Sequence, residues 1–375
     1  MSRICILDIT STNLDPLSAT LTIATIDDLT GAIISPPHLT AHGTLDLNSS
    51  IALNHQIIKK FQTATYQDRY FGGIKLPEAI VTNVADLIDE LQIEIQSLKD
   101  LLDRTLAAES WSKIREGLLE SLNGVDTKEP IRLVIITDDP HIQALPIENT
   151  LFIKNKLGKG NRPVSVIFAP RRQPHKLVWQ DTPKILLVLG SQKDIEKPID
   201  FAEIQKYFPS TATFEILENP TKEQAIDLIS DRSFDIIIII GHSCINNDST
   251  DGRININDRD SISIQDFTQP FRNSVHRGLK LVILAGCSSI GAAKALASEN
   301  IGVPNVIAFR IPVHYRALRL FFDRLLKRWI ADSQSLEVAL TNTRGELSAI
   351  EGDCPGSSIL PILFTSPYDP PLKFP

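Results

Sequence analysis

The sequence contains little of what several classes of protein need. Only four cysteines occur among the 375 residues, far apart and without CxxC spacing, so we expect thiols rather than disulfides. No apolar run approaches the ~20 residues that cross a bilayer. The N-terminal stretch MSRICILDITS lacks the basic start, apolar middle and cleavage site of a signal peptide. We therefore expect a cytoplasmic protein that does not bind membranes.

Concentrated positive charge is also missing. The net charge is −7, and the densest basic stretch, IKNKLGKGNRP, is short, so direct nucleic-acid binding is not indicated. The same stretch lacks the GxxxxGK[ST] pattern of a phosphate-binding loop, and no cofactor is indicated. The stretch RALRLFFDRLLKRWI is basic and amphipathic, and we interpret it as a helix that covers a sheet and exposes a solvated basic face.

The chain divides into three predicted segments. Residues 1–75 contain short apolar or alternating runs broken by Asn, Asp, Pro and Gly, which predicts a β-rich region, interpreted as a regulatory or partner surface. Residues 76–175 contain a helical segment, one long helix or two over 84–122, followed by the first strands of the main domain. Residues 176–375 are predicted to form the catalytic subdomain.

Strands and helices alternate after residue 130, which favours crossover connections and a mainly parallel sheet. The predicted strands are 131–137, 162–170, 184–190, 213–218, 235–241, 279–286, 305–309 and 359–364. The predicted helices between them are 200–208, 222–230, 292–298, 314–330 and 335–350. The predicted fold class is α/β, with a mainly parallel sheet between two helical layers and a β-rich N-terminal extension.

Two of these strands are continuous aliphatic runs. A strand buried on both faces has this pattern, so IIIII (236–240) and LVILA (281–285) are predicted to be central strands. Each run is followed by a glycine and then by a reactive side chain, His242 in one case and Cys287 in the other. In open α/β sheets the functional crevice lies beyond the carboxyl ends of the strands, so imidazole and thiol are expected in one crevice.

A cysteine and a histidine in one crevice can cleave an amide. The thiol becomes a strong nucleophile when a base removes its proton, and the imidazole can then protonate the leaving amine. The backbone N–H groups of Ser243 and Cys287 are the candidate oxyanion donors. The residues after Cys287, SSIGAAKALA, are mostly small, which allows a substrate backbone to come close.

Two metal sites are alternatives at these positions. His242, Cys244 and Cys287 could bind zinc with water as a fourth ligand, although no fourth protein ligand is evident. Residues 247–258 imitate a calcium loop, but Asn247 and Asp258 are poor choices for its first and last ligands. Asp-Gly at 251–252 favours a hairpin there instead. We expect no metal.

Several stretches together resemble the CHAT family of caspase-like cysteine peptidases, which are related in fold to caspases and separase. They are IIIIIGHS, LVILAGCSS, GVPNVIAFRIPV, SLEVALTNTRGEL and ILPILF, with IRLVIITDDPHIQALPIENTLF as a weaker upstream match that contains a Leu-Pro-x-Glu turn. The resemblance covers roughly residues 75–370. It implies a caspase-like sheet and a catalytic dyad of His242 and Cys287.

The resemblance also implies differences in specificity. Many members have glycine where this chain has Ser243, and the family commonly has Trp-Pro-Val-x-Asp where this chain has Ile311-Pro-Val-His-Tyr315. The family aspartate is a candidate for holding a basic P1 side chain, and Tyr315 cannot supply its charge. We therefore expect a P1 preference other than Arg or Lys, with Arg310 and Tyr315 as candidate substrate contacts.

The resulting hypothesis is a cysteine endopeptidase that acts on a protein substrate. By resemblance it belongs to bacterial signalling or defence, where such peptidases are usually attached to a sensor domain. Because no sensor is evident in this sequence, we expect a separate protein activator or sensor partner. The alternative is a catalytically inactive caspase-like scaffold that binds a protein partner.

Overall fold

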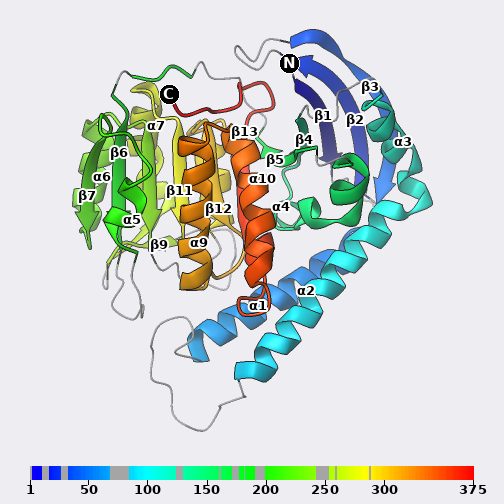
Figure 1. Ribbon diagram of the computed structural model, residues 1–375, viewed down its shortest axis with the longest axis horizontal. Helices are drawn as coiled ribbons and strands as arrows, with labels where there is room; N and C mark the ends of the chain where they lie inside the picture. The colour runs from blue at the N-terminus through cyan, green and yellow to red at the C-terminus, as the bar shows by residue number, and fades with distance from the viewer. Residues whose placement is uncertain are drawn as a thin grey trace.

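A computed structural model describes residues 2–10, 17–26, 33–67, 84–123, 130–159, 162–170, 177–180, 182–190, 199–241, 253–257, 260–286 and 289–375. Eleven strands of this described part form one sheet with helices on both faces (Figure 1). The fold is α/β with a mostly parallel sheet, as the alternation of strands and helices predicted.

The sheet consists of two halves that meet at one antiparallel pair of strands, β13 and β12. The mixed half contains, in sheet order, β3 (Ile33–Leu45), β2 (Leu17–Ile26), β1 (Ser2–Thr10), β4 (Ile131–Ile136), β5 (Val164–Ala169) and β13 (Pro361–Thr365). The parallel half continues with β12 (Asn305–Phe309), β11 (Leu281–Ala285), β8 (Ile236–Ile240), β6 (Lys184–Leu189) and β7 (Thr213–Glu218).

Strand direction distinguishes the two halves. All five strands of the parallel half run the same way. In the mixed half, β1, β4, β5 and β13 are parallel to one another, while β2 runs against both of its neighbours. The carboxyl ends of β8, β11 and β12 therefore share one edge with the amino end of β13, and this edge is called the site edge below.

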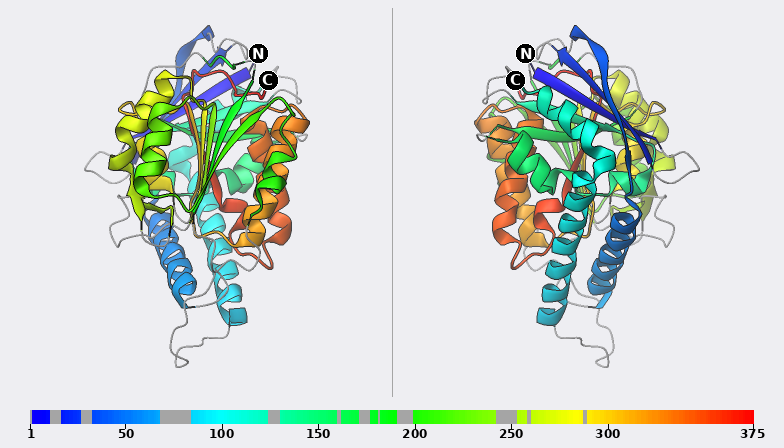
Figure 2. Two further views of the ribbon diagram at one scale, coloured as in Figure 1. Left: turned by 90° about the vertical axis from the view of Figure 1, so that its left-hand side faces the viewer. Right: turned by 90° about the vertical axis from the view of Figure 1, so that its right-hand side faces the viewer.

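Helices cover the parallel half and its junction with the mixed half on both faces, which makes three layers (Figure 2). One face carries α5 (Phe201–Gln205), α9 (Tyr315–Leu326) and α10 (Leu336–Leu347), and the other carries α6 (Lys222–Asp231), α7 (Ile264–His276) and α8 (Ile290–Ala297). These layers explain the aliphatic runs: every residue of β8 and β11 is buried, as expected for strands covered on both sides.

The remaining elements are short or lie on the mixed half. They are α3 (Ser112–Glu120), α4 (Pro140–Gln143), the 3₁₀ turns η1 (Glu109–Trp111), η2 (Ile147–Asn149), η5 (Ser348–Ile350) and η6 (Ser357–Ile359), the π-helical segments η3 (Phe152–Leu157) and η4 (Lys327–Ala331), and the small hairpin of β9 (Arg253–Asn255) and β10 (Ser261–Ser263). The predicted turn at 251–252 lies outside the described residues.

A pair of long helices extends from the body beside the sheet. These helices, α1 (Asn48–Gln67) and α2 (Val84–Ala107), pack side by side and are called the helical hairpin below (Figure 2). The prediction of a β-rich region up to residue 75 was wrong for α1, because the strands end at Leu45. The buried side of α1 includes the polar residues Ser50 and Asn54 beside Ile57 and Phe61, so no continuous apolar stripe identified the helix.

The N-terminal strands share the sheet and the hydrophobic core with the rest of the protein. β1 pairs in parallel with β4 along its length, and buried side chains of both strands belong to one continuous cluster. A domain boundary near residue 75 stays a prediction. The pairing of β1 with β4 argues against separate domains that fold independently on the two sides of that boundary.

An ion pair fixes the start of the two central strands. Asp235 directly precedes β8 and Lys280 directly precedes β11, and Lys280 Nζ lies 2.6 Å from a carboxylate oxygen of Asp235. Both side chains are buried, and the other Asp235 oxygen accepts the backbone N–H of Lys184. Since the partners are held at one point, the pair sets the register of β8 against β11.

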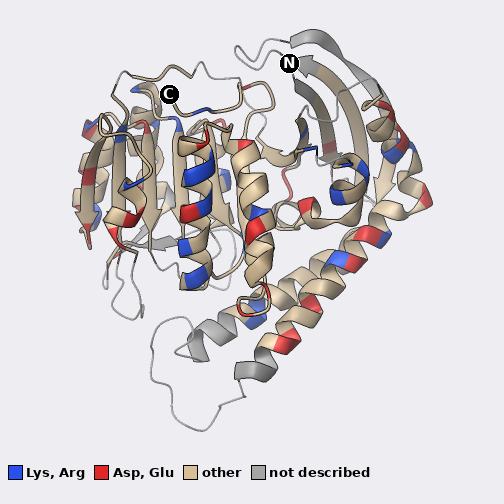
Figure 3. Cartoon of the chain, in the orientation of Figure 1, with Lys and Arg blue, Asp and Glu red and all other residues tan. Residues whose placement is uncertain are grey.

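The basic helix α9 has the contacts of a helix that covers a sheet. Most of its apolar side chains are buried, and its outer face is mainly basic with one acidic residue, Asp323 (Figure 3). Arg319 pairs with Glu203, and Arg324 pairs with Glu346. Among the described residues, no helix is long and apolar enough to cross a membrane.

Candidate active site

The predicted dyad follows two strands that are direct neighbours. His242, Ser243, Cys244 and Cys287 themselves lie outside the described residues. The strands that lead to them are described: β8 and β11 pair in parallel, and the last pair in register is Ile240 with Ala285. His242 and Cys287 each come two residues after a member of that pair. The two strands that lead to them therefore end side by side at the site edge.

The chain is anchored again immediately beyond Cys287. Ser289 is buried, and its hydroxyl donates to the Leu284 carbonyl at 2.9 Å and accepts the Phe309 N–H at 3.0 Å. The Ser289 N–H donates to the Phe309 carbonyl at 2.9 Å. These bonds tie the residue to both β11 and β12, and α8 begins at the next residue. The chain is therefore anchored in the sheet before residue 287, by β11, and again at Ser289.

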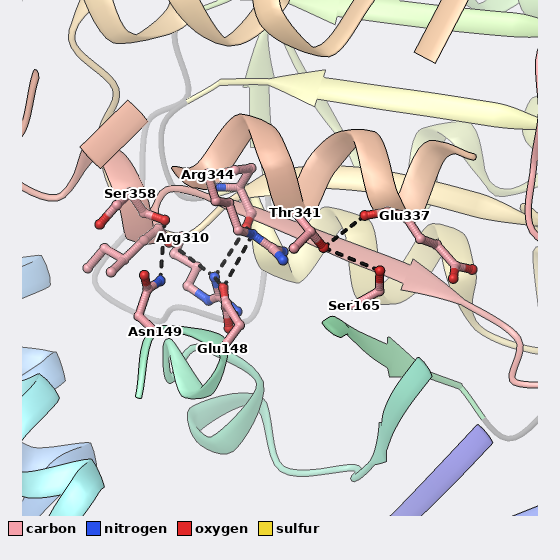
Figure 4. Close-up of polar contacts among 10 residues, drawn as sticks. Glu148, Asn149, Ser165, Arg310, Glu337, Thr341, Arg344 and Ser358 are labelled. Carbon is pink, nitrogen blue, oxygen red and sulfur yellow. Dashed lines mark hydrogen bonds and ion pairs between the residues drawn. The ribbon is translucent and has the colours of Figure 1, made fainter. Parts of the chain in front are cut away.

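A buried cluster of charges lies where the two sheet halves meet (Figure 4). Arg310, the residue after β12, binds both carboxylate oxygens of Glu148, at 2.5 Å and 3.1 Å. Arg344 of α10 lies 3.5 Å from the same carboxylate, and both arginines donate to the Pro361 carbonyl at the start of β13. One carboxylate thus connects η2, the end of β12 and α10.

The charge state of this triad follows from its surroundings. Burial alone would raise the pKa of Glu148, but the charges of Arg310 and Arg344 lower it below its ordinary value, so the carboxylate stays ionised. Burial lowers the pKa of Arg344 to about 10, with the Glu148 charge acting in the opposite direction. At neutral pH the cluster contains one anion and two cations. Backbone carbonyls accept further hydrogen bonds from the two guanidinium groups.

A second cysteine and histidine are close together elsewhere at the site edge. Cys354 Sγ lies 3.4 Å from His314 Nδ1, and the same nitrogen accepts the Arg316 N–H at the start of α9. Burial raises the pKa of the Cys354 thiol to about 11, so it stays protonated at neutral pH. This pair therefore lacks the thiolate that nucleophilic catalysis needs, and its contacts are those of a structural pair.

Comparison with known families agrees with this arrangement. The CHAT domain matches residues 94–354, well over half of the chain. The chain belongs to the CHAT domain family. CHAT is a caspase-like domain related to cysteine peptidases, as the sequence motifs predicted. Comparison with curated proteins returned no match.

The CHAT motifs meet at the buried triad. Glu148 is the glutamate of the Leu-Pro-x-Glu turn, Arg310 follows the VPNVIAF strand, and Arg344 lies in the ALTNTRGEL helix. Sequence reasoning noted these stretches without pairing them, and it missed Glu148, Arg344 and Ser289 as contacts that organise the site edge. The available signal for Glu148 and Arg344 was that each is a charged residue inside a stretch that resembles the family, and Ser289 had no such signal.

The predicted substrate contacts have different surroundings. Arg310 is 2% exposed, and its guanidinium binds Glu148 and the Ile359 and Pro361 carbonyls. Its role as a substrate contact stays a prediction, and these contacts favour a structural role. Tyr315 is half-buried at the start of α9, with its ring against that of His314. A substrate contact there also stays a prediction.

The metal alternatives fall mainly on residues outside the described part. This applies to the zinc ligands and to most of the segment 247–258. Within that segment, Asn257 is described, and its side chain binds the Pro220 carbonyl and Asp260. Among the described residues, no group of three or more His, Cys, Asp and Glu side chains could hold a metal ion.

Proposed function

We propose that this CHAT protein is a cysteine endopeptidase with Cys287 as the nucleophile and His242 as the base. The in-register pair of Ile240 and Ala285 is the observation that carries the proposal, because both candidates follow it by the same interval. Family membership supports the reaction class. Neighbouring parallel strands that end together are the usual position of a functional crevice in α/β folds.

The proposed reaction has two stages, formation of a thioester on Cys287 and its hydrolysis, and His242 moves protons in both. The His242 imidazole takes the proton of Cys287, and the thiolate attacks the peptide carbonyl carbon. The backbone N–H groups of Ser243 and Cys287 stabilise the oxyanion of the tetrahedral intermediate. The imidazolium then protonates the leaving amine, the C–N bond breaks, and a thioester remains. Water, deprotonated by His242, hydrolyses the thioester and releases the thiol.

The described neighbours of Cys287 support this role. Helix α8 begins at Ile290, three residues further along the chain, and the positive end of its dipole favours a thiolate and an oxyanion nearby. The bonds of Ser289 to Leu284 and Phe309 hold the helix start against β11 and β12. Anchoring of the chain this close to a nucleophile favours catalysis, since small displacements of a nucleophile reduce the rate strongly.

The substrate of the proposed enzyme is a protein, and its P1 side chain is not simply Arg or Lys. Ile311 and Tyr315 replace the tryptophan and aspartate common in relatives. The carboxylate of Asp353 lies 3.3 Å from the guanidinium of Arg316, the residue after Tyr315, and that cation offsets its charge. We also propose that a protein activator or sensor partner controls the enzyme, as in signalling and defence systems.

Activity-based labelling tests the proposal. A panel of peptidyl acyloxymethyl ketones, varied at P1, is applied to wild type and to Cys287→Ala, with and without cell extract. We expect covalent labelling of wild type on Cys287, none in Cys287→Ala or His242→Ala, and unchanged labelling in the control Cys244→Ser. Labelling that survives in Cys287→Ala would exclude the proposed nucleophile. Absence of labelling under all conditions would favour the inactive scaffold.

A further inference from the structure

The loop between α10 and β13 is organised by one carboxylate. Glu351 accepts the N–H groups of Gly356 and Ser358, both at 3.0 Å, and the Ser357 hydroxyl at 3.4 Å. These donors belong to the start of η6. Residues 351–360, called the connecting loop below, therefore have a fixed shape that depends on the position of Glu351.

The helical hairpin holds this carboxylate from the outside. Lys99 Nζ of α2 lies 3.6 Å from Glu351. About two turns earlier on the same helix, the Gln92 amide donates to the Gly352 carbonyl at 2.6 Å. The Lys99 and Glu351 side chains are largely shielded from water, so their attraction is screened less than that of a surface pair. Movement of α2 would consequently move the connecting loop.

The opposite side of the connecting loop contacts the segment that follows β12. Cys354 lies against His314, and the Leu360 carbonyl accepts the Arg310 N–H at 2.9 Å. Residues 310–316, called the post-β12 segment below, include both partners. The connecting loop thus lies between the helical hairpin and this segment, with polar contacts to each.

Gly356 marks the point where all three parts meet. Its φ of +79° favours glycine, and a Cβ at this position would overlap Ile311 of the post-β12 segment. The same Cβ would lie 3.3 Å from Phe61 of α1 and 3.4 Å from Ile95 of α2. Both hairpin helices therefore pack within contact distance of the backbone that supports Ile311.

The last step leads to the candidate site. Phe309, directly before the post-β12 segment, exchanges backbone and hydroxyl bonds with Ser289, two residues beyond Cys287. We infer that the helical hairpin regulates the candidate site: its docking orders the post-β12 segment through the connecting loop, and its displacement loosens that segment. The inference rests on the proposed function and names the route by which a protein partner on the hairpin would act.

Hydrogen–deuterium exchange tests this route without a substrate. The double variant Gln92→Ala/Lys99→Ala removes both polar contacts of α2 with the connecting loop. The matched control Gln96→Ala/Arg104→Ala removes an amide and a cation from the exposed face of the same helix. We expect the amides of 310–316 to exchange at least about threefold faster in the first variant and at the wild-type rate in the control.

The alkylation rate of Cys287, measured on the same samples by peptide mass spectrometry, extends the test to the site. We expect it to change at least about twofold in the first variant only. Unchanged exchange at 310–316 would overturn the route. Faster exchange with an unchanged alkylation rate would overturn the regulatory inference. The exchange measurement does not depend on peptidase labelling. The proposed peptidase function and the proposed route from the helical hairpin can therefore be contradicted separately.

Discussion

The parallel half and the mixed half of the sheet are stabilised in different ways. In the parallel half, β8 and β11 are wholly aliphatic, and the ion pair of Asp235 and Lys280 lies before the strands begin. In the mixed half, charges lie inside the core. Arg132 points from β4 to a bidentate pair with Glu337 of α10, and the triad around Glu148 lies at the junction with the parallel half.

The difference separates two tasks. Aliphatic packing is non-directional, so it holds the strands of the parallel half while their ends stay available for chemistry. Buried ion pairs are directional and costly when incomplete, so they fix how α10 and the turns of the mixed half dock. We expect mutations in the two halves to differ in kind, and the following predictions test that difference from the largest effect to the smallest.

Glu148→Ala is expected to be the most damaging of these changes. It leaves Arg310 and Arg344 buried without their carboxylate, and removing one partner of a buried pair typically costs about 3–5 kcal/mol. Urea unfolding at neutral pH measures the loss. The control is Glu90→Ala, which removes a carboxylate from an exposed pair with Lys60 and should cost less than about 1 kcal/mol. Equal losses would remove the distinction between buried and surface charge.

Ile238→Ala probes the aliphatic half at the centre of β8. The residue is fully buried, and such a truncation costs about 2–5 kcal/mol through lost transfer energy and a cavity. The graded control Ile238→Val should cost about 0.5–1.5 kcal/mol. A loss that does not scale with the volume removed would contradict a packing origin for the stability of this half.

Gly356→Ala tests the junction where the helical hairpin meets the post-β12 segment. The new Cβ overlaps Ile311 Cδ1, and the positive φ adds strain, so we expect a loss of about 1–3 kcal/mol. Ile311→Val removes the overlapping methyl group. In a double-mutant cycle, the pair should therefore cost less than the sum of the single changes. Strict additivity would show that Gly356 and Ile311 do not contact each other in solution.

The smallest expected effect is a difference between the two halves of the sheet in how their stability depends on pH. The folded-state pKa of Glu148 is lowered from its ordinary value of 4.5, so its contribution is complete above that pH and disappears as pH falls through the lowered value. The stability difference between wild type and Glu148→Gln should narrow below about pH 4.5. The difference between wild type and Ile238→Ala should stay constant, and narrowing there as well would contradict this assignment.

The sequence predicted the elements whose pattern is local. The aliphatic runs of β8 and β11 were correctly assigned, because a strand that is buried on both faces has a continuous apolar sequence. The alternation of strands and helices from β4 to α10 was correct in its main elements, with α7 as the exception. The helical spacing over 84–122 correctly allowed two helices, α2 and α3. Helix α7 was missed, and Pro270 in its interior is the sequence signal that argues against a helix.

Features that depend on distant partners could not be predicted. Glu148 and Arg310 are 162 residues apart, and nothing in the neighbourhood of either identifies the other. The reversed direction of β13 relative to β12 depends on how α10 returns the chain to the sheet. Ser289 was noted only as one of several small residues after Cys287, because its importance comes from its bonds to β11 and β12.

The pH dependence of Cys287 alkylation tests the proposed dyad most directly. Iodoacetamide rates are measured peptide by peptide in wild type and in His242→Ala, with Cys354, 2% exposed and with a pKa raised to about 11, as the unreactive internal reference. A dyad predicts a wild-type apparent thiol pKa below about 7, shifting toward about 8.5 when the imidazole is removed. The same profile in both proteins, with a midpoint near about 8.5, would contradict the pairing of Cys287 with His242.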